Sequence, residues 1–140
     1  MKTKIRIFKD MGGLSCNAAD LFVEQAEHSI AQRGRFLVAL NGGSTPNRLF
    51  QLLATEYRDR VDWSKVHVFW GDERCVPYDD PGSSYGQARA AFLNHVSIPL
   101  ENIHGVNTNL SPVEAAKDYA HILSQFSNSQ FPFPRFDLVY

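Results

Sequence analysis

The chain has 140 residues, of which 44% are hydrophobic and 21% are charged, and its formal net charge is −1. This length suits one compact domain, and the balance is ordinary for a globular protein. The basic excess of a nucleic-acid-binding protein is missing, and no apolar run reaches the length of a membrane span, so neither partner is expected. Two cysteines are too few for a disulfide scaffold, and no secretion signal is visible, which favours a cytoplasmic protein.

The first part of the chain alternates between expected strands and helices. Alternating apolar residues predict a strand over residues 5–8, which the glycine-containing stretch 11–13 should end. Apolar residues at helical spacing predict a helix over residues 16–33, with Gly34 as its stop. The continuous apolar run 36–40 is typical of a central parallel strand that is covered on both faces.

The rest of the chain continues this alternation, in the order helix 46–56, strand 66–70, helix 85–93, a short strand near Ile103, helix 112–126 and strand 136–140. Such an order is typical of a Rossmann-like, doubly wound α/β fold with a mainly parallel sheet and helices on both faces. The last strand has no covering helix after it. We therefore expect residues 1–140 to form one partial domain, truncated after the first strand of its C-terminal half.

A glycine turn after the strand 36–40 is the first candidate site, with the sequence Asn41, Gly42, Gly43, Ser44, Thr45 and Pro46. The glycines permit a tight turn and close approach of a ligand, and Thr45 and Pro46 suit the cap and first position of the next helix. Free N–H groups at the helix start, together with the hydroxyls of Ser44 and Thr45, would cradle an anion. An ordinary strand-to-helix turn with a good cap explains the same residues.

The second candidate site follows the next buried strand, with the sequence Gly71, Asp72, Glu73 and Arg74. Ligands bind outside the carboxyl ends of the strands in open parallel sheets, so neighbouring strands would bring both loops to one crevice. Arg74 offers a planar cationic fork to a phosphate, and the two carboxylates can accept hydrogen bonds from sugar hydroxyls. A solvated turn with local ion pairs is the alternative for such a triplet.

These segments resemble the 6-phosphogluconolactonase family in order and register. Residues 41–46 resemble its S-G-G-S-T-P loop, with Asn41 in place of the first Ser. Residues 70–85 resemble its W-x-D-E-R-x-V-P…D-D…S-N-Y block, with Ser84 in place of Asn, and residues 136–139 resemble the strand that leads into G-x-D-G-H. Glucosamine-6-phosphate deaminases share the G-S-T-P loop but typically carry D-E-Y instead of D-E-R.

The resemblance implies a cofactor-free and metal-free hydrolysis of 6-phosphoglucono-1,5-lactone to 6-phosphogluconate, in the pentose phosphate pathway. By resemblance, the phosphate would be held by Gly42, Gly43, Ser44, Thr45 and Arg74. Asp72 would contact the sugar and orient water or the base, and Asn41 and Glu73 would also line the site.

The catalytic histidine of the family lies in its G-x-D-G-H segment, which these 140 residues do not contain. We therefore expect the chain to be inactive by itself. A deaminase-like enzyme and a non-catalytic fragment that binds sugar phosphates are the alternative hypotheses. The exposed edge of the C-terminal strand also predicts self-association.

Overall fold

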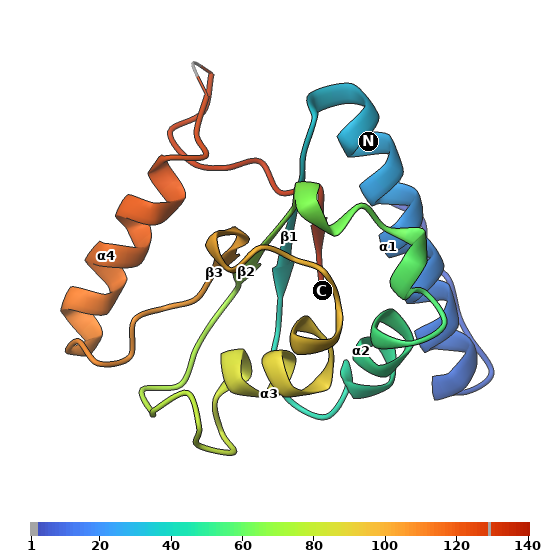
Figure 1. Ribbon diagram of the computed structural model, residues 1–140, viewed down its shortest axis with the longest axis horizontal. Coiled ribbons are helices and arrows are strands. Elements are labelled where there is room, and N and C mark those ends of the chain that lie inside the picture. Colours follow the sequence, from blue (N-terminus) through green and yellow to red (C-terminus); the bar gives the residue numbers. More distant parts are fainter. Residues whose placement is uncertain (1–2, 129) are drawn as a thin grey trace.

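The computed structural model describes residues 3–128 and 130–140, in which a parallel sheet is enclosed between helices (Figure 1). The strands of this part of the chain are β1 (Phe36–Leu40), β2 (Val66–Trp70), β3 (Ile103–His104) and β4 (Leu138–Val139). They lie in the order β3-β2-β1-β4, and every pairing is parallel. The predicted parallel sheet is therefore confirmed, with β1 and β2 at its centre.

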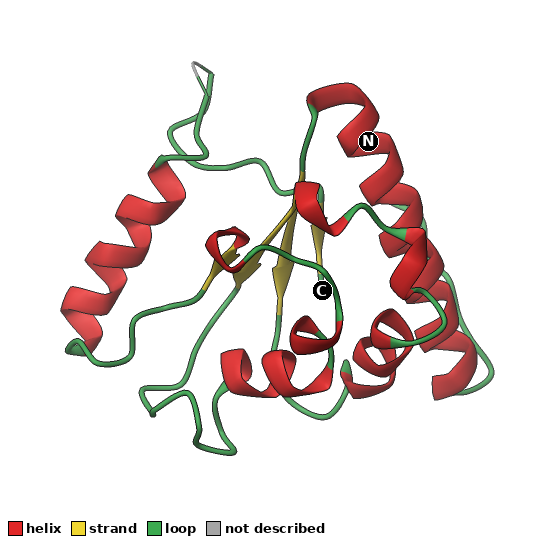
Figure 2. Cartoon of the chain, in the orientation of Figure 1, coloured by secondary structure: helices red, strands yellow, loops and turns green. Residues whose placement is uncertain are grey.

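Helices cover both faces of the sheet, as predicted (Figure 2). On one face lie α1 (Met11–Arg33), α2 (Asn47–Ala54) and α3 (Ser84–Ala91), which close a large aromatic-rich core. On the other face lies α4 (Pro112–Ser124), whose C-terminal end packs near a smaller core. Helices on both faces explain the continuous apolar run of β1. Successive side chains of a strand point to opposite faces of the sheet, and both faces are buried here.

The order of the strands places a topological switch point in the sheet. The chain moves outward from β1 through β2 to β3, and then returns across the other face through α4 to place β4 on the far side of β1. Crevices at the carboxyl ends of the strands beside such a switch point are the usual ligand sites of open α/β sheets. The two candidate loops directly follow β1 and β2, so both lie at that end.

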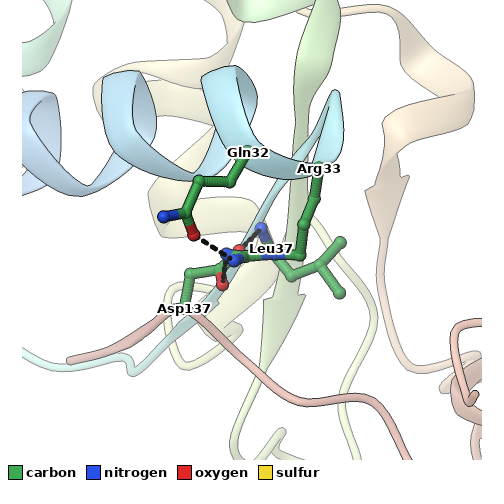
Figure 3. A network of polar contacts seen from close by, with 4 residues as sticks. All are labelled: Gln32, Arg33, Leu37 and Asp137. Atoms are coloured by element: carbon green, nitrogen blue, oxygen red, sulfur yellow. Dashed lines mark hydrogen bonds and ion pairs between the residues drawn. The ribbon is translucent and has the colours of Figure 1, made fainter.

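A buried carboxylate fixes the C-terminal strand to β1 (Figure 3). Asp137 accepts a hydrogen bond from the backbone N–H of Leu37 (2.9 Å) and an ion-paired hydrogen bond from the guanidinium of Arg33. Arg33 also donates to the Gln32 side chain (3.2 Å), which holds the guanidinium beside the carboxylate. The Asp137 side chain is only 9% exposed, whereas that of Arg33 is 48% exposed, so the bond to Leu37 is better shielded from competing water than the ion pair.

Replacing Asp137 with alanine should lower the free energy of unfolding by about 2–3 kcal/mol, because a charge-assisted bond is lost and the Leu37 N–H is left unpaired. Asp137→Asn keeps an acceptor oxygen and should cost less. Urea unfolding measures both variants, with Asp59→Ala as control, since its ion pair with Arg58 is exposed and worth little. Equal stability of Asp137→Ala and Asp59→Ala would contradict this role.

The predicted strand over residues 5–8 is wrong. The segment forms no strand, and Ile5 and Ile7 are 81% and 91% exposed. An alternating pattern becomes a strand only when it pairs with a sheet edge and buries one face, and this segment does neither. The segment instead lies beside α1, where the Arg6 guanidinium donates to Asn17 (3.0 Å).

Helix α1 begins at Met11 and not at residue 16, so the expected break at residues 11–13 is also wrong. Asp10 is its N-cap and accepts from the backbone N–H of Gly13 (2.8 Å), which offsets the low helix propensity of the two glycines. Gly34 ends the helix in the left-handed conformation (φ 73°), as predicted.

No helix in the described part of the chain combines the length and apolarity that a membrane crossing needs.

Two half-buried histidines lie on the α4 face of the sheet. Nδ1 of His67 and Nε2 of His104 are 3.2 Å apart, and both rings pack against Phe126. Burial, and then the charge of His67, lower the pKa of His104 to about 4. Burial also lowers the pKa of His67, with a smaller contribution from Arg35.

This pair should make the fold acid-sensitive. The pKa of a histidine in the unfolded chain is near 6.5, whereas that of His104 in the folded chain is about 4. Between these pH values the unfolded chain therefore binds more protons than the folded chain. The histidine contribution to stability is complete above pH 6.5 and is lost as pH falls through this window. We expect a lower Tm at pH 5 than at pH 7.5, and a smaller difference in His104→Asn. The exposed His28 gives the control variant His28→Asn, which should keep the full difference.

Candidate functional site

The loops after β1 and β2 meet in one cavity of about 450 Å³ at the carboxyl end of the sheet. It is lined by Asn41, Gly42, Gly43, Gly71, Asp72, Arg74 and Ser84. The structure thus brings the glycine turn together with two members of the Asp-Glu-Arg triplet, although these segments are about thirty positions apart in the sequence.

The pairing of β1 with β2 sets how the two loops meet. The two strands end in register, Leu40 opposite Trp70, and the Gly71 N–H donates to the Leu40 carbonyl (3.0 Å). A side-chain carbon at Gly71 would lie 2.9 Å from Oδ1 of Asn41, so the two loops lie close together and a larger residue at Gly71 would displace the Asn41 side chain. Gly43 has a φ of 92°, a conformation that other residues adopt only with strain.

Backbone donors gather along the glycine turn. The N–H groups of Gly42, Ser44 and Thr45 make no hydrogen bond among the described residues, whereas the Gly43 N–H donates to Oε1 of Gln87 (3.2 Å). Pro46 is the N-cap of α2, and no side chain caps this helix, so the prediction that Thr45 caps it is wrong. The free donors of this turn, which lies directly before α2, are suited to an anion.

Ser44 and Thr45 lie outside the shared cavity. Ser44 contributes to a neighbouring hollow of about 710 Å³ together with Gln51 and Gln87. Thr45 contributes to a mostly apolar hollow of about 400 Å³, which Tyr140 also lines and which shares Asn41 and Gly42 with the main cavity. The residues of the turn therefore line three different hollows, and Gly42 and Gly43 are the ones that share the main cavity with Arg74.

Asp72 and Arg74 contribute the charges of the cavity. Both residues are exposed or half-exposed, and neither side chain makes an ion pair or hydrogen bond among residues 3–128 and 130–140. The guanidinium can therefore bind an anion without first breaking an internal contact. Within the same part of the chain, no three His, Cys, Asp or Glu side chains come together as a metal site requires.

Glu73 does not line the main cavity, contrary to the prediction. Its carboxylate accepts from the backbone N–H groups of Ser84 and Tyr85 (both 2.8 Å) and from the Ser83 hydroxyl (3.3 Å). These donors are at the start of α3, where the helix dipole favours a negative charge. Glu73 thus occupies the N-terminus of α3 as an internal anion and fixes the loop that carries Arg74.

Helix α3 contributes two side chains that the sequence did not single out as site residues. Ser84 lines the cavity, and Gln87 joins the two loops, because its Oε1 accepts from Gly43 and its Nε2 donates to the Pro81 carbonyl (2.7 Å). The serine pair that begins α3 was a detectable signal for the start of a helix. The bridge made by Gln87 depends on the packing of α3 between the loops and left no sequence signal.

Comparisons with known proteins agree with this architecture. The profile of the family "Glucosamine-6-phosphate isomerases/6-phosphogluconolactonase" matches residues 9–140. The 6-phosphogluconolactonase of Nostoc shares 41% sequence identity with this chain, in an alignment that covers 99% of the chain. The 6-phosphogluconolactonase of Mycobacterium leprae shares 36% identity, also over 99% of the chain. The crystal structure of the 6-phosphogluconolactonase from Thermotoga maritima superposes on 99% of this chain with a TM-score of 0.85 and 27% identity.

The match covers only part of each relative. The chain spans 58% of the Nostoc protein, 58% of the Mycobacterium leprae protein and 58% of the Thermotoga maritima structure. A monomeric glucosamine-6-phosphate deaminase also shares the fold, with a TM-score of 0.76 over 88% of the chain at 17% identity. The family match covers nearly the whole chain, and we conclude that the chain belongs to the glucosamine-6-phosphate isomerase/6-phosphogluconolactonase family.

Proposed function

We propose that this chain supplies the substrate-binding loops of a 6-phosphogluconolactonase, which hydrolyses 6-phosphoglucono-1,5-lactone to 6-phosphogluconate. The observation that carries the proposal is the single cavity shared by the glycine turn and Arg74. Backbone N–H groups without partners and a guanidinium without an ion pair suit a phosphate dianion. The names of the relatives from Nostoc and Mycobacterium leprae support the reaction.

The proposed roles follow from the placement of each residue. Gly42 and Arg74 donate to the phosphate inside the cavity, while Gly43, whose N–H already donates to Gln87, lets the ligand approach the turn because it has no side chain. Ser44 and Thr45, which lie outside the cavity, would contribute their backbone N–H groups only to a ligand that extends beyond it. The remote phosphate anchors the substrate, so that the lactone carbonyl meets water in a productive geometry. Asp72 lies in the same cavity and is suited to accept hydrogen bonds from sugar hydroxyls and to orient water or a general base.

Glucosamine 6-phosphate is the substrate of the alternative hypothesis, because the family includes both activities by name. The deaminase structure is only 17% identical and supports the fold alone. Arg74 favours the lactonase, since the deaminases that this chain resembles typically have tyrosine after Asp-Glu.

Three measurements test the proposed function. The 140-residue chain should bind 6-phosphogluconate but not gluconate, as followed by amide chemical shifts, because the phosphate supplies the anchor. We expect the same chain to hydrolyse the lactone no faster than buffer. The whole protein from the same gene should hydrolyse the lactone and release no ammonia from glucosamine 6-phosphate. The opposite pair of activities would establish the deaminase instead.

We propose a cytoplasmic location and self-association as further properties of this chain. Two rice relatives are named as chloroplastic, so localisation needs a direct test, such as fractionation of the source cells. Self-association would use the outer edge of β4, which pairs only with β1 in the described part of the chain. Light scattering over a concentration series measures it, and a constant monomer mass would contradict it.

A further inference from the structure

Ser84 is the side chain that α3 presents to the cavity. It is the first residue of the helix, and its side chain is nearly buried, with 4% of the residue exposed. That remaining exposure faces the cavity, because Ser84 is one of the lining residues together with Asp72 and Arg74. In the sequence, Ser84 is recognisable only as a substitution within a loop motif.

The hydroxyl of Ser84 makes no hydrogen bond among the described residues. Its backbone N–H is used by Glu73, and the neighbouring Ser83 hydroxyl is used as the N-cap of α3, where it accepts from the Gly86 N–H (3.0 Å). Because Ser84 lines the cavity, this hydroxyl can bind a ligand there without first breaking an internal hydrogen bond.

The position of this hydroxyl identifies the part of the ligand that it would contact. A side-chain carbon built on Gly42 would lie 2.1 Å from Oγ of Ser84, so the hydroxyl lies directly against the glycine turn. The Gly42 N–H beside it has no partner among the described residues. A backbone donor, a hydroxyl and the Arg74 guanidinium thus share one cavity, which is the donor set that a phosphate requires.

We propose that the Ser84 hydroxyl donates a hydrogen bond to the phosphate of the bound sugar phosphate, next to the glycine turn. This inference rests on the proposed function and assigns to that site a phosphate-binding residue on α3. Because Glu73 already takes the N–H groups of Ser84 and Tyr85, the contribution of α3 to the ligand is a side-chain hydroxyl and not its helix N-terminus.

The test compares Ser84→Ala, Arg74→Ala and Ser29→Ala in the 140-residue chain. Ser29 is also buried, at 1% exposed, but lies on α1 and does not line this cavity. Dissociation constants for 6-phosphogluconate and for inorganic phosphate come from titrations followed by amide chemical shifts, and Tm comes from thermal unfolding.

Ser84→Ala should weaken the binding of both ligands by about tenfold, the effect of losing one charge-assisted hydrogen bond. It should leave Tm unchanged or slightly raised, because the folded protein loses no internal bond. Ser29→Ala should leave both dissociation constants unchanged. A fall in Tm without a change in affinity would show a structural role and overturn the inference.

The remaining outcomes separate this inference from the proposed function. If Arg74→Ala weakens binding and Ser84→Ala does not, the serine assignment is wrong and the phosphate site stands. If Ser84→Ala weakens binding of 6-phosphogluconate but not of inorganic phosphate, the hydroxyl contacts the sugar and the assignment to the phosphate is wrong. If the unmodified chain binds neither ligand, the proposed function fails, and the serine assignment fails with it.

Discussion

Arg74→Ala should abolish most of the affinity of the chain for 6-phosphogluconate, with a dissociation constant roughly 30- to 100-fold higher. The guanidinium lies in the cavity beside the glycine turn and has no ion-pair partner in the described part of the chain. Its full charge and both of its forked donors are therefore available to the phosphate. Loss of such a charge-assisted pair corresponds to about 2–3 kcal/mol.

Arg74→Lys distinguishes charge from geometry at this position. Lysine keeps the positive charge but loses the planar fork, so we expect an affinity between those of the native chain and Arg74→Ala. Isothermal titration at a fixed salt concentration measures the series, with Arg58→Ala as control because Arg58 is exposed and does not line the cavity. Unchanged affinity in Arg74→Ala would remove the main support for the phosphate site.

The elements with strong apolar patterns were predictable from the sequence. β1 is a continuous apolar run, β2 is rich in β-branched and aromatic residues, and the switch to helical spacing after each strand indicated the parallel sheet. The segment 5–8 shows the limit of this reasoning. Its alternation is a local property, whereas a strand also needs a pairing partner and a core that buries one of its faces, and the segment alone shows neither.

The site was predictable at the level of loops but not of side-chain directions. Parallel pairing of β1 with β2 required that the two loops end at one side of the sheet, which the sequence indicated. The triplet Asp72, Glu73 and Arg74 contains three charged residues in a row, and nothing in their order shows which of them points away from the ligand. The direction of Glu73 is set by α3, which begins about ten positions later and brings its own unpaired N–H groups to the loop.

Glu73→Ala should be the most destabilising change in the loops of the site, because it leaves the N–H groups of Ser84 and Tyr85 without an acceptor. We expect a loss of about 2–3 kcal/mol in the free energy of unfolding, or roughly 6–12 °C in Tm. Affinity for 6-phosphogluconate should also fall when measured well below this lower Tm, because the loop that carries Arg74 is no longer fixed to α3.

Glu73→Gln separates the two functions that the carboxylate could have. Glutamine keeps one acceptor oxygen for α3 but loses the negative charge that the helix N-terminus favours, so its Tm should lie between those of Glu73→Ala and the native chain. The exposed Glu101 gives the control variant Glu101→Ala, which should change neither Tm nor affinity. If Glu73→Ala weakens binding while Tm stays constant, Glu73 contacts the ligand directly, and the internal-anion role that the structure assigns to it is wrong. A parallel loss of stability and affinity means instead that the Asp-Glu-Arg triplet combines two ligand-facing charges with one residue that holds them in place.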